Sequence, residues 1–276
     1  MMGAAKRIMM TRPSHYKVNY SINAWMDVHN QADSSKATKQ WEMLKSTIEK
    51  CGANVEVMES EDAKHYPDIV FCANAGIIRG RKVYLSHFAY PERAGEFVYY
   101  QRFFESIGYE TFYNKELVHE GAGDALWCSK GMNTLVSGVG PRSDHRSCSD
   151  ISKNLLISKD DEFQVVAARL IDPRFYHIDT CFCPLNENQA LSYLPAFDPV
   201  SQNNIQNYTD IVQVPEEDAK KFACNAVVVG KHVILHQGSE TTMKLLEKNG
   251  FEPHPIDMSE FIKAGGSAKC CTLRLE

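Results

Sequence analysis

The apolar and polar positions of this chain repeat one pattern five times: a small or polar turn followed by an apolar, β-rich run. The five segments read "VFCANAGII", "HEGAGDALW", "YHIDTCFCPL", "ACNAVVVG" and "GGSAKCCTLRL". Their starts lie roughly 40 to 60 residues apart, a spacing typical of repeated supersecondary units. The pattern therefore predicts five copies of one structural unit.

Hairpins and helices complete the predicted unit. "IIRGRKVYLS", "LWCSKGMNTLVSG" and "VVVGKHVILH" each place a glycine-containing turn between two strand-like runs. Residues 36–52, 92–108 and 239–250 have the periodicity and closing glycine of amphipathic helices, and Ser239 is expected to cap the third. Alternating Cys271, Leu273 and Leu275 predict a strand at the C-terminus, with adjacent thiols pointing to opposite faces.

These elements predict an α/β fold in which five ββαβ units surround one axis. No Pro/Ser-rich linker or charge block divides the chain, so residues 1–276 are expected to form a single domain. The ring would bring the polar turns together at the axis and join distant motifs in one pocket. A doubly wound fold is less consistent, because "GAGDAL" and "GVGPRSD" lack the G-x-G-x-x-G spacing.

Composition limits which partners and which cellular compartment are expected. The 276 residues are 43% hydrophobic and carry a net charge of −5, without the basic patches of nucleic-acid binders. No apolar stretch approaches the roughly 20 residues that span a bilayer, so we expect a cytoplasmic protein with no nucleic-acid or membrane partner. The nine cysteines are expected to be mostly reduced. A homo-oligomer is left open.

The candidate catalytic and binding residues lie in the turns, although each residue alone has an ordinary structural explanation. Cys270 follows two glycines at the start of the last apolar run, and an inert packing role is common for a buried cysteine. His177 and Asp179, two positions apart, are expected on one strand face. Glu120 and Asp124 bracket glycines, where carboxylates often only cap a turn.

Two arginines are also candidates. Arg93 lies at the predicted start of a helix, where a basic side chain opposes the helix dipole, so something other than helix stability is expected to explain it. Arg142 follows "GP" in a loop, where a solvated side chain is the simpler interpretation.

Seven stretches together resemble one family. They are "YSINAWMD", "FCANAG", "HFAYPERAGE", "EGAGD", "GPRSD", "FYHIDT" and "GGSAKC". In order and spacing, the chain is similar to the guanidino-group-modifying superfamily of the pentein fold, especially dimethylargininase and the arginine dihydrolase domain related to arginine deiminases. The resemblance covers most of the chain and implies a hydrolase acting on C–N bonds of a guanidino substrate.

The resemblance also implies roles for individual residues. Cys270 corresponds to the nucleophile, His177 to the general acid/base and Glu120 to its carboxylate partner. Asp179, with Glu120, would hold the guanidinium. The expected substrate contacts are Asn23, Asn74, Arg93, Arg142, Asp124 and Asp179, with the two arginines gripping the substrate carboxylate and Cys271 packing in the core.

The residue types suit this chemistry. A guanidinium carbon is a poor electrophile, so its attack calls for a thiolate, which a cationic substrate would itself favour. His177 would protonate the departing amine and then activate water to break a thiouronium intermediate. No cofactor and no dedicated metal site are expected.

One departure from the dimethylargininase pattern affects the predicted substrate. Asn74 in "ANAG" replaces an acidic residue, and "EGAGD" and "INAWM" also resemble the arginine dihydrolases. We therefore expect arginine to be converted to ornithine, carbon dioxide and ammonia, with dimethylarginine as the alternative substrate. An amidinotransferase, or a non-catalytic protein binding arginine or a metal, also remains open. The metal ligands would then be His177, Cys181, Cys183 and Cys270.

Overall fold

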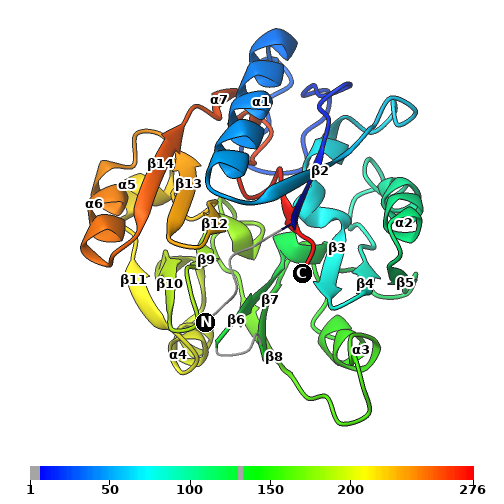
Figure 1. Ribbon diagram of the computed structural model, residues 1–276, viewed down its shortest axis with the longest axis vertical. Helices are drawn as coiled ribbons and strands as arrows, with labels where there is room; N and C mark the ends of the chain where they lie inside the picture. The colour runs from blue at the N-terminus through cyan, green and yellow to red at the C-terminus, as the bar shows by residue number, and fades with distance from the viewer. Residues whose placement is uncertain (1–6, 130–132) are drawn as a thin grey trace.

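The structure, a computed structural model, describes residues 7–129 and 133–276. Fifteen strands form five three-stranded sheets that surround the centre of the molecule (Figure 1). The strands are β1 Arg7–Thr11, β2 Asn54–Met58, β3 Gly76–Arg79, β4 Lys82–Leu85, β5 Glu110–Phe112, β6 Ala125–Cys128, β7 Thr134–Val139, β8 Gln164–Arg169, β9 Phe182–Pro184, β10 Gln189–Ser192, β11 Asp210–Gln213, β12 Val227–Val229, β13 His232–His236, β14 Glu252–Ile256 and β15 Leu273–Arg274.

Each sheet has the same topology. An antiparallel pair is followed by a helical connection to a third strand, which pairs parallel to the second. In the first sheet the C-terminal β15 takes the place of the opening strand, so β15-β1-β2 closes the ring. The predicted ring of five ββαβ units is confirmed.

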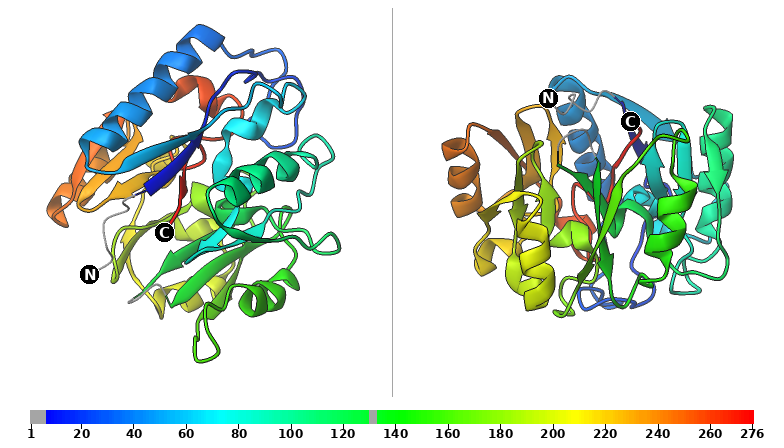
Figure 2. Two further views of the ribbon diagram at one scale, coloured as in Figure 1. Left: turned by 45° about the vertical axis from the view of Figure 1, so that its right-hand side comes forward. Right: turned by 90° about the horizontal axis from the view of Figure 1, so that it is seen from below.

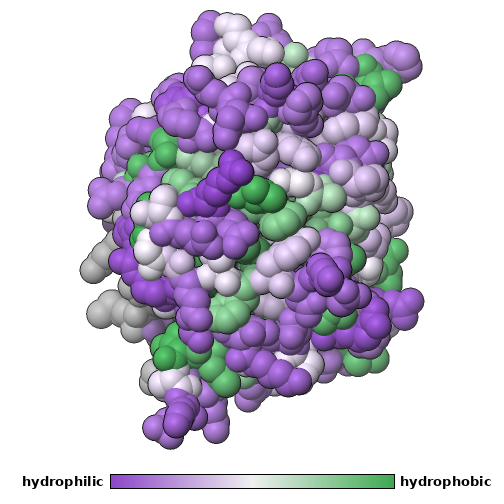
Figure 3. Space-filling model, turned by 90° about the vertical axis from the view of Figure 1, so that its right-hand side faces the viewer, coloured by the Kyte–Doolittle hydropathy of each residue, from purple (hydrophilic) through white to green (hydrophobic). Residues whose placement is uncertain are grey.

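The helices lie on the outside of the ring (Figures 1 and 2). They are α1 Ser34–Lys50, α2 Glu96–Ser106, α3 Ser147–Asn154, α4 Pro199–Gln206, α5 Glu216–Ala219, α6 Glu240–Lys248 and α7 Ser259–Ile262. In α1, Asp33 caps the first turn and Trp41, Leu44 and Ile48 bury one face, as their periodicity predicts. The side that carries α2 and α3 is mostly hydrophilic, with smaller apolar patches (Figure 3).

Polar turns open the units and face the axis, as predicted. Three of them are 3-10 turns: η2 Cys72–Ala75, η3 Gly121–Gly123 and η5 Ile178–Thr180. The turn η2 packs against η3, and η3 packs against η5, although the three are far apart in sequence. The other two opening turns precede β12 and β15, and the last one contains Cys270.

Several local predictions need correction. Cys270 and Cys271 lie in a turn before the short β15, so strand alternation does not separate their side chains. His177 and Asp179 belong to η5 and its N-cap, not to one strand face, because β9 begins only at Phe182. Ser239 precedes α6 but its side chain makes no capping hydrogen bond. The tip of the β6–β7 hairpin, residues 130–132, lies outside the described residues.

All nine cysteines are free, in agreement with the predicted reduced state. None of the described helices combines the length and apolar character needed to cross a bilayer.

Candidate active site

Cys270 is fixed from two sides. Asn225 donates from Nδ2 to its Sγ at 3.1 Å and accepts at Oδ1 from its backbone nitrogen, also at 3.1 Å. The thiol faces the Asp179 carboxylate, with Sγ 3.4 Å from Oδ2. Burial, and then Asp179, raise the pKa of Cys270 well above its ordinary value. The unliganded protein therefore holds a thiol, and a cation placed nearby would favour the thiolate.

The preceding glycines explain how this turn fits. Gly265 has φ +84°, and an added Cβ there would lie 2.7 Å from Asn23 Oδ1 and 2.9 Å from the Tyr176 hydroxyl. At Gly266 an added Cβ would lie 2.5 Å from the Phe71 ring. A side chain at either position would collide with the site, so the paired glycines let the backbone pass close to it.

His177 is oriented by Glu120. Its Nε2 lies 2.7 Å from Glu120 Oε2, which also accepts from Arg142 Nη1 at 2.9 Å. The second oxygen of Glu120 accepts from the Ala89 backbone at 3.0 Å. Burial alone would raise the pKa of Glu120, but Arg142 and His177 hold it at about 2. Glu120 is therefore ionised at neutral pH, and its oxygens are occupied by protein groups.

Arg142 is buried rather than solvated, and its whole guanidinium is packed. Its Nη2 donates to the Ile22 carbonyl at 2.6 Å. Its Cζ lies 4.5 Å from the ring centroid of Tyr90 and 4.8 Å from that of Tyr176. These cation–π contacts hold the guanidinium beside Glu120.

Arg93 connects a second carboxylate to Asn74. Its Nε and Nη2 donate to the two oxygens of Glu96 at 2.9 and 2.8 Å, and its Nη1 donates to Asn74 Oδ1 at 2.9 Å. Asn74 Nδ2 donates to the Glu120 carbonyl at 2.8 Å, so the orientation of the amide is defined. Arg93 precedes α2 and pairs with the first residue of that helix, which accounts for its position. Its role toward a substrate carboxylate stays a prediction.

Asn23 lies in the segment between β1 and α1. Its amide donates to the Ala264 carbonyl at 3.0 Å and accepts from the Trp25 backbone at 2.9 Å. With Ile22 it lines one wall of the cavity at Cys270. Substrate contact by Asn23 also stays a prediction.

Asp124 joins the loop that carries Arg142 to the turn that follows His177. Its Oδ2 accepts from the Ser143 hydroxyl at 2.6 Å and its Oδ1 from the Ile178 backbone at 3.1 Å. Ser143 directly follows Arg142, and Ile178 directly follows His177, so one carboxylate fixes the backbone beside both residues. Burial raises the pKa of Asp124 to about 6. This geometry indicates a positioning role, and it does not place Asp124 on the cavity wall.

The cavity at Cys270 is closed in this structure. It measures about 10 Å³, room for about one water molecule. Its walls include Asp68, Asn74, Arg93, Arg142 and Cys270, and Ile22 and Asn23 lie against them. A guanidino substrate therefore requires the wall to move outward before it can enter.

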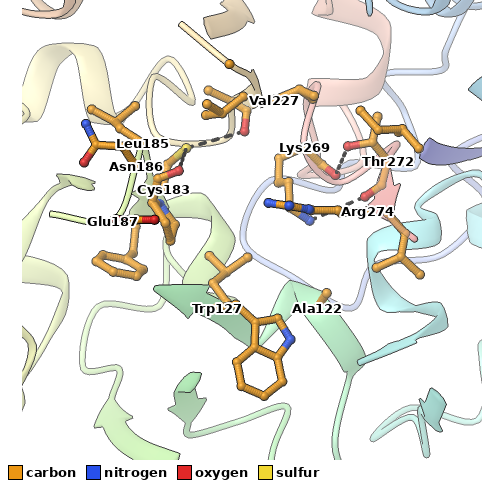
Figure 4. Close-up of a pocket in the computed structure, with 18 of the residues that line it drawn as sticks. Ala122, Trp127, Cys183, Leu185, Asn186, Glu187, Val227, Lys269, Thr272 and Arg274 are labelled. Atoms are coloured by element: carbon orange, nitrogen blue, oxygen red, sulfur yellow. Dashed lines mark hydrogen bonds between the residues drawn. The ribbon is translucent and has the colours of Figure 1, made fainter. Parts of the chain in front are cut away.

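A larger cavity of about 580 Å³ is lined by residues of β3, β6, β9, β12 and β15, the opening strands of the five units, and by Ala122, Lys269 and Thr272 of the opening turns. Figure 4 shows Lys269, Thr272 and Arg274 on one side of it, opposite Leu185, Asn186 and Glu187. The buried thiol, imidazole and paired carboxylates do not line this space. Size alone would select it, but the Cys270 thiol lines the smaller cavity together with Arg93 and Arg142.

Two functional candidates were missed in the sequence. Asn225 lies in the fourth repeated segment, "ACNAVVVG", and the repeat itself was a signal that its turn would reach the axis. Asp68 lies in the 3-10 turn Pro67–Val70, outside the repeat. Its buried Oδ1 has no hydrogen-bond partner within residues 7–129 and 133–276, and it lines the small cavity.

The soft side chains proposed as an alternative metal site have separate partners. The thiols of Cys181 and Cys183 face the carbonyls of Ile178 and Ala226, each at 3.5 Å. His177 pairs with Glu120, and Cys270 faces Asp179.

Comparison with known proteins agrees with this geometry. The family described as "N,N dimethylarginine dimethylhydrolase, eukaryotic" matches residues 8–276. The bifunctional arginine dihydrolase/ornithine cyclodeaminase ArgZ of Synechocystis sp. is 42% identical over 98% of this chain, which spans only 37% of that protein. The N(G),N(G)-dimethylarginine dimethylaminohydrolase of Mycobacterium tuberculosis is 36% identical over 98% of this chain and 86% of its own length.

Solved structures of the N-terminal domain of ArgZ are similar along their whole length. A cysteine-to-serine variant bound to substrate and an asparagine-to-serine variant covalently bound to a reaction intermediate each align with a TM-score of 0.91. The alignment covers 98% of this chain and 97% of theirs, at 42% identity.

Proposed function

This chain belongs to the dimethylarginine dimethylhydrolase family, and on that premise we propose that it hydrolyses free L-arginine at the guanidino carbon through a covalent bond to Cys270. The resemblance stated from the sequence is confirmed, and with it the assignment to hydrolases of amidine C–N bonds. The substrate is the proposal.

The observation that carries the proposal is an unbalanced set of buried charges around Cys270. Arg93 and Arg142 are matched by Glu96 and Glu120. Asp68 and Asp179 are also buried, but neither forms an ion pair with any described residue. Buried carboxylates without an ion-pair partner are costly, so the surroundings of Cys270 favour a cationic ligand.

The first hydrolysis follows from these positions. A bound guanidinium compensates Asp179 and lowers the pKa of the adjacent thiol, whose thiolate attacks the guanidino carbon. His177 protonates the departing nitrogen, so ammonia leaves and a thiouronium adduct remains on sulfur. His177 then takes a proton from water, which attacks the same carbon and releases citrulline and the thiolate. Glu120 keeps the imidazole oriented.

A second hydrolysis yields ornithine if citrulline stays bound. Attack of Cys270 on the ureido carbon expels the second ammonia, and water cleaves the resulting thiocarbamate to a carbamate that breaks down to ornithine and carbon dioxide. The overall reaction consumes one arginine and two waters and yields one ornithine, one carbon dioxide and two ammonia molecules. Asn74 supports retention, because an amide offers a donor and an acceptor to a neutral ureido group. The N-terminal domain of ArgZ with an asparagine replaced by serine has been solved covalently bound to a reaction intermediate, which supports a covalent mechanism.

The test is product analysis after incubation with arginine, asymmetric dimethylarginine and agmatine. We expect ornithine and two equivalents of ammonia from arginine, and a mass adduct on Cys270 when the reaction is quenched. Arginine converted only to citrulline, or left unchanged, would overturn the proposal.

Dimethylarginine remains the second candidate substrate. The matching family and the M. tuberculosis relative carry that activity in their names. Release of dimethylamine, with arginine unchanged, would select this alternative. A single catalytic domain over residues 1–276 and a cytoplasmic location stay predictions.

A further inference from the structure

A second cluster of reactive side chains lies on the outside of the ring, away from Cys270. Cys51 follows the last residue of α1, His232 begins β13 and His254 lies on β14. One ligand atom from each, the Cys51 sulfur and a nitrogen from each imidazole, lie within 4.8 Å of one another. All three residues are partly buried, so the cluster is partly shielded from solvent and can still be reached by an ion.

The strand register places the two imidazoles together. In the parallel β13–β14 pair, His232 lies opposite Glu252, so the two side chains share a face of the sheet. His254, two residues after Glu252, also lies on that face. His232 Nδ1 is 3.0 Å from His254 Nε2 and 3.1 Å from Glu252 Oε2. Three potential ligands therefore converge from one sheet, and Cys51 meets them from α1.

We propose that Cys51, His232 and His254 form a binding site for Zn²⁺, with the Glu252 carboxylate or a water molecule as the fourth ligand. Thiolate, imidazole and carboxylate are the ligands that zinc binds in tetrahedral sites. With zinc–nitrogen bonds of about 2.0 Å and a zinc–sulfur bond of about 2.3 Å, tetrahedral geometry requires ligand separations of roughly 3.3 to 3.6 Å. The observed separations, 3.0 Å between the two imidazole nitrogens and at most 4.8 Å among all three atoms, are close to this geometry. The Cys51 thiol releases its proton to solvent when it binds.

The site would join two units of the ring. The helix α1 connects β1 to β2 in the first sheet, whereas His232 and His254 belong to the fifth sheet, and α1 packs beside β13 and β14 (Figures 1 and 2). The ring closes between these two units, and the segment that follows β14 carries Cys270. A metal ion here would link the first and last units without contacting the thiol. No dedicated metal site was expected from the sequence, in which these three residues are far apart.

The test uses the full chain with Cys270→Ser, so that the active-site thiol does not bind metal. Zn²⁺ binding is measured by equilibrium dialysis, and Co²⁺ substitution by the visible bands of a tetrahedral site and the near-ultraviolet thiolate band. We expect one Zn²⁺ per chain with a dissociation constant below about 1 µM, and a higher Tm with zinc. Separate Cys51→Ser and His254→Ala changes should weaken binding by at least about 100-fold and remove the thiolate band or the tetrahedral bands.

Cys148→Ser, at another partly buried cysteine, and His145→Ala, at an exposed histidine, are matched controls and should bind zinc like the parent. Absence of stoichiometric binding in the parent would overturn the proposal. Binding that survives both Cys51→Ser and His254→Ala would overturn it as well, because the ion would then occupy other residues.

Discussion

The two sides of the Cys270 thiol differ in how their buried charges are compensated. On the His177 side, Glu120 accepts from Arg142, His177 and the Ala89 backbone. On the Asp179 side, the carboxylate faces the Cys270 thiol, and Lys269, Cys270 and Asn225 lower its pKa without outweighing burial. Both carboxylates are fully buried.

The pKa values of the two carboxyl groups move in opposite directions for this reason. Arg142 and His177 outweigh burial and hold the pKa of Glu120 at about 2, whereas burial raises the pKa of Asp179 to about 6. On the His177 side, the Glu120 carboxylate has its hydrogen-bond partners before substrate binds. The Asp179 carboxylate keeps its cost of burial until a cation enters, so under the proposed mechanism the difference separates preorganised catalytic groups from a binding surface.

The largest expected effect comes from the thiol between the two sides. Cys270→Ser should lower kcat by at least about 10³-fold, because a serine hydroxyl is far less nucleophilic than a thiolate. Cys271→Ser should retain activity within about 10-fold, because only Cys270 of the two lines the small cavity and faces Asp179. Ammonia release measures both, with Tm as the folding control. Equal losses in two folded variants would contradict the assignment.

Glu120→Gln tests the compensated side. It keeps the shape but removes the charge that stabilises protonated His177, and we expect kcat to fall by about 10²-fold to 10³-fold. The pKa of Glu120 is lower when folded than its ordinary 4.5, so its stabilisation is present above pH 4.5 and is lost as pH falls toward 2. The variant should lose about 3 kcal/mol of unfolding free energy at pH 7 and much less near pH 3, measured by urea titration.

Asp179→Asn tests the uncompensated side, and its effect on stability should have the opposite sign. The folded pKa of about 6 exceeds the ordinary 3.8, so ionisation of Asp179 costs stability as pH rises from 3.8 through 6. Asparagine avoids that cost, and the variant should gain up to about 3 kcal/mol at pH 8 and little at pH 4.

In the same variant, activity should fall although stability rises. Loss of the charge that holds the guanidinium should lower kcat/KM for arginine by about 10²-fold. A variant that is less stable than the parent at pH 8 would show that Asp179 is compensated by groups other than a substrate.

The sequence predicted the repeated parts of the site better than the single ones. Asn74, Glu120, His177 and Cys270 belong to repeated segments, and a ring of such units necessarily brings their turns together. Asn225 occupies the same place in its unit, but its role depends on reaching Sγ and a backbone nitrogen, which an apolar "NAVVV" run does not indicate. Asp68 has no counterpart in the repeat.

Pairing between side chains was harder to predict than their location. The Arg93–Glu96 pair is local and visible as an i, i+3 spacing, yet the Arg142–Glu120 pair exists only because the loop after β7 folds back over η3. A side chain assigned to a substrate by resemblance can therefore be held by a protein carboxylate in the unliganded form. Asp124 shows the same point, since its partners are the hydroxyl and backbone beside two site residues.

The smallest expected effect is a change of product, at Asn74, which lies between Glu120 and Arg93. Asn74 donates to the Glu120 carbonyl and accepts from Arg93, and it lines the cavity at Cys270. In Asn74→Asp, one carboxylate oxygen would face the Glu120 carbonyl at hydrogen-bond distance without a proton between them, and a neutral ureido group would lose a donor. The cationic guanidinium would still bind, so the first hydrolysis should slow by less than about 10-fold. The neutral citrulline should leave sooner, so the ratio of citrulline to ornithine should rise, as measured by amino-acid analysis at early time points.

Asn74→Ala serves as the control for lost contacts without added charge, and an unchanged product ratio in Asn74→Asp would show that retention of citrulline depends on other residues.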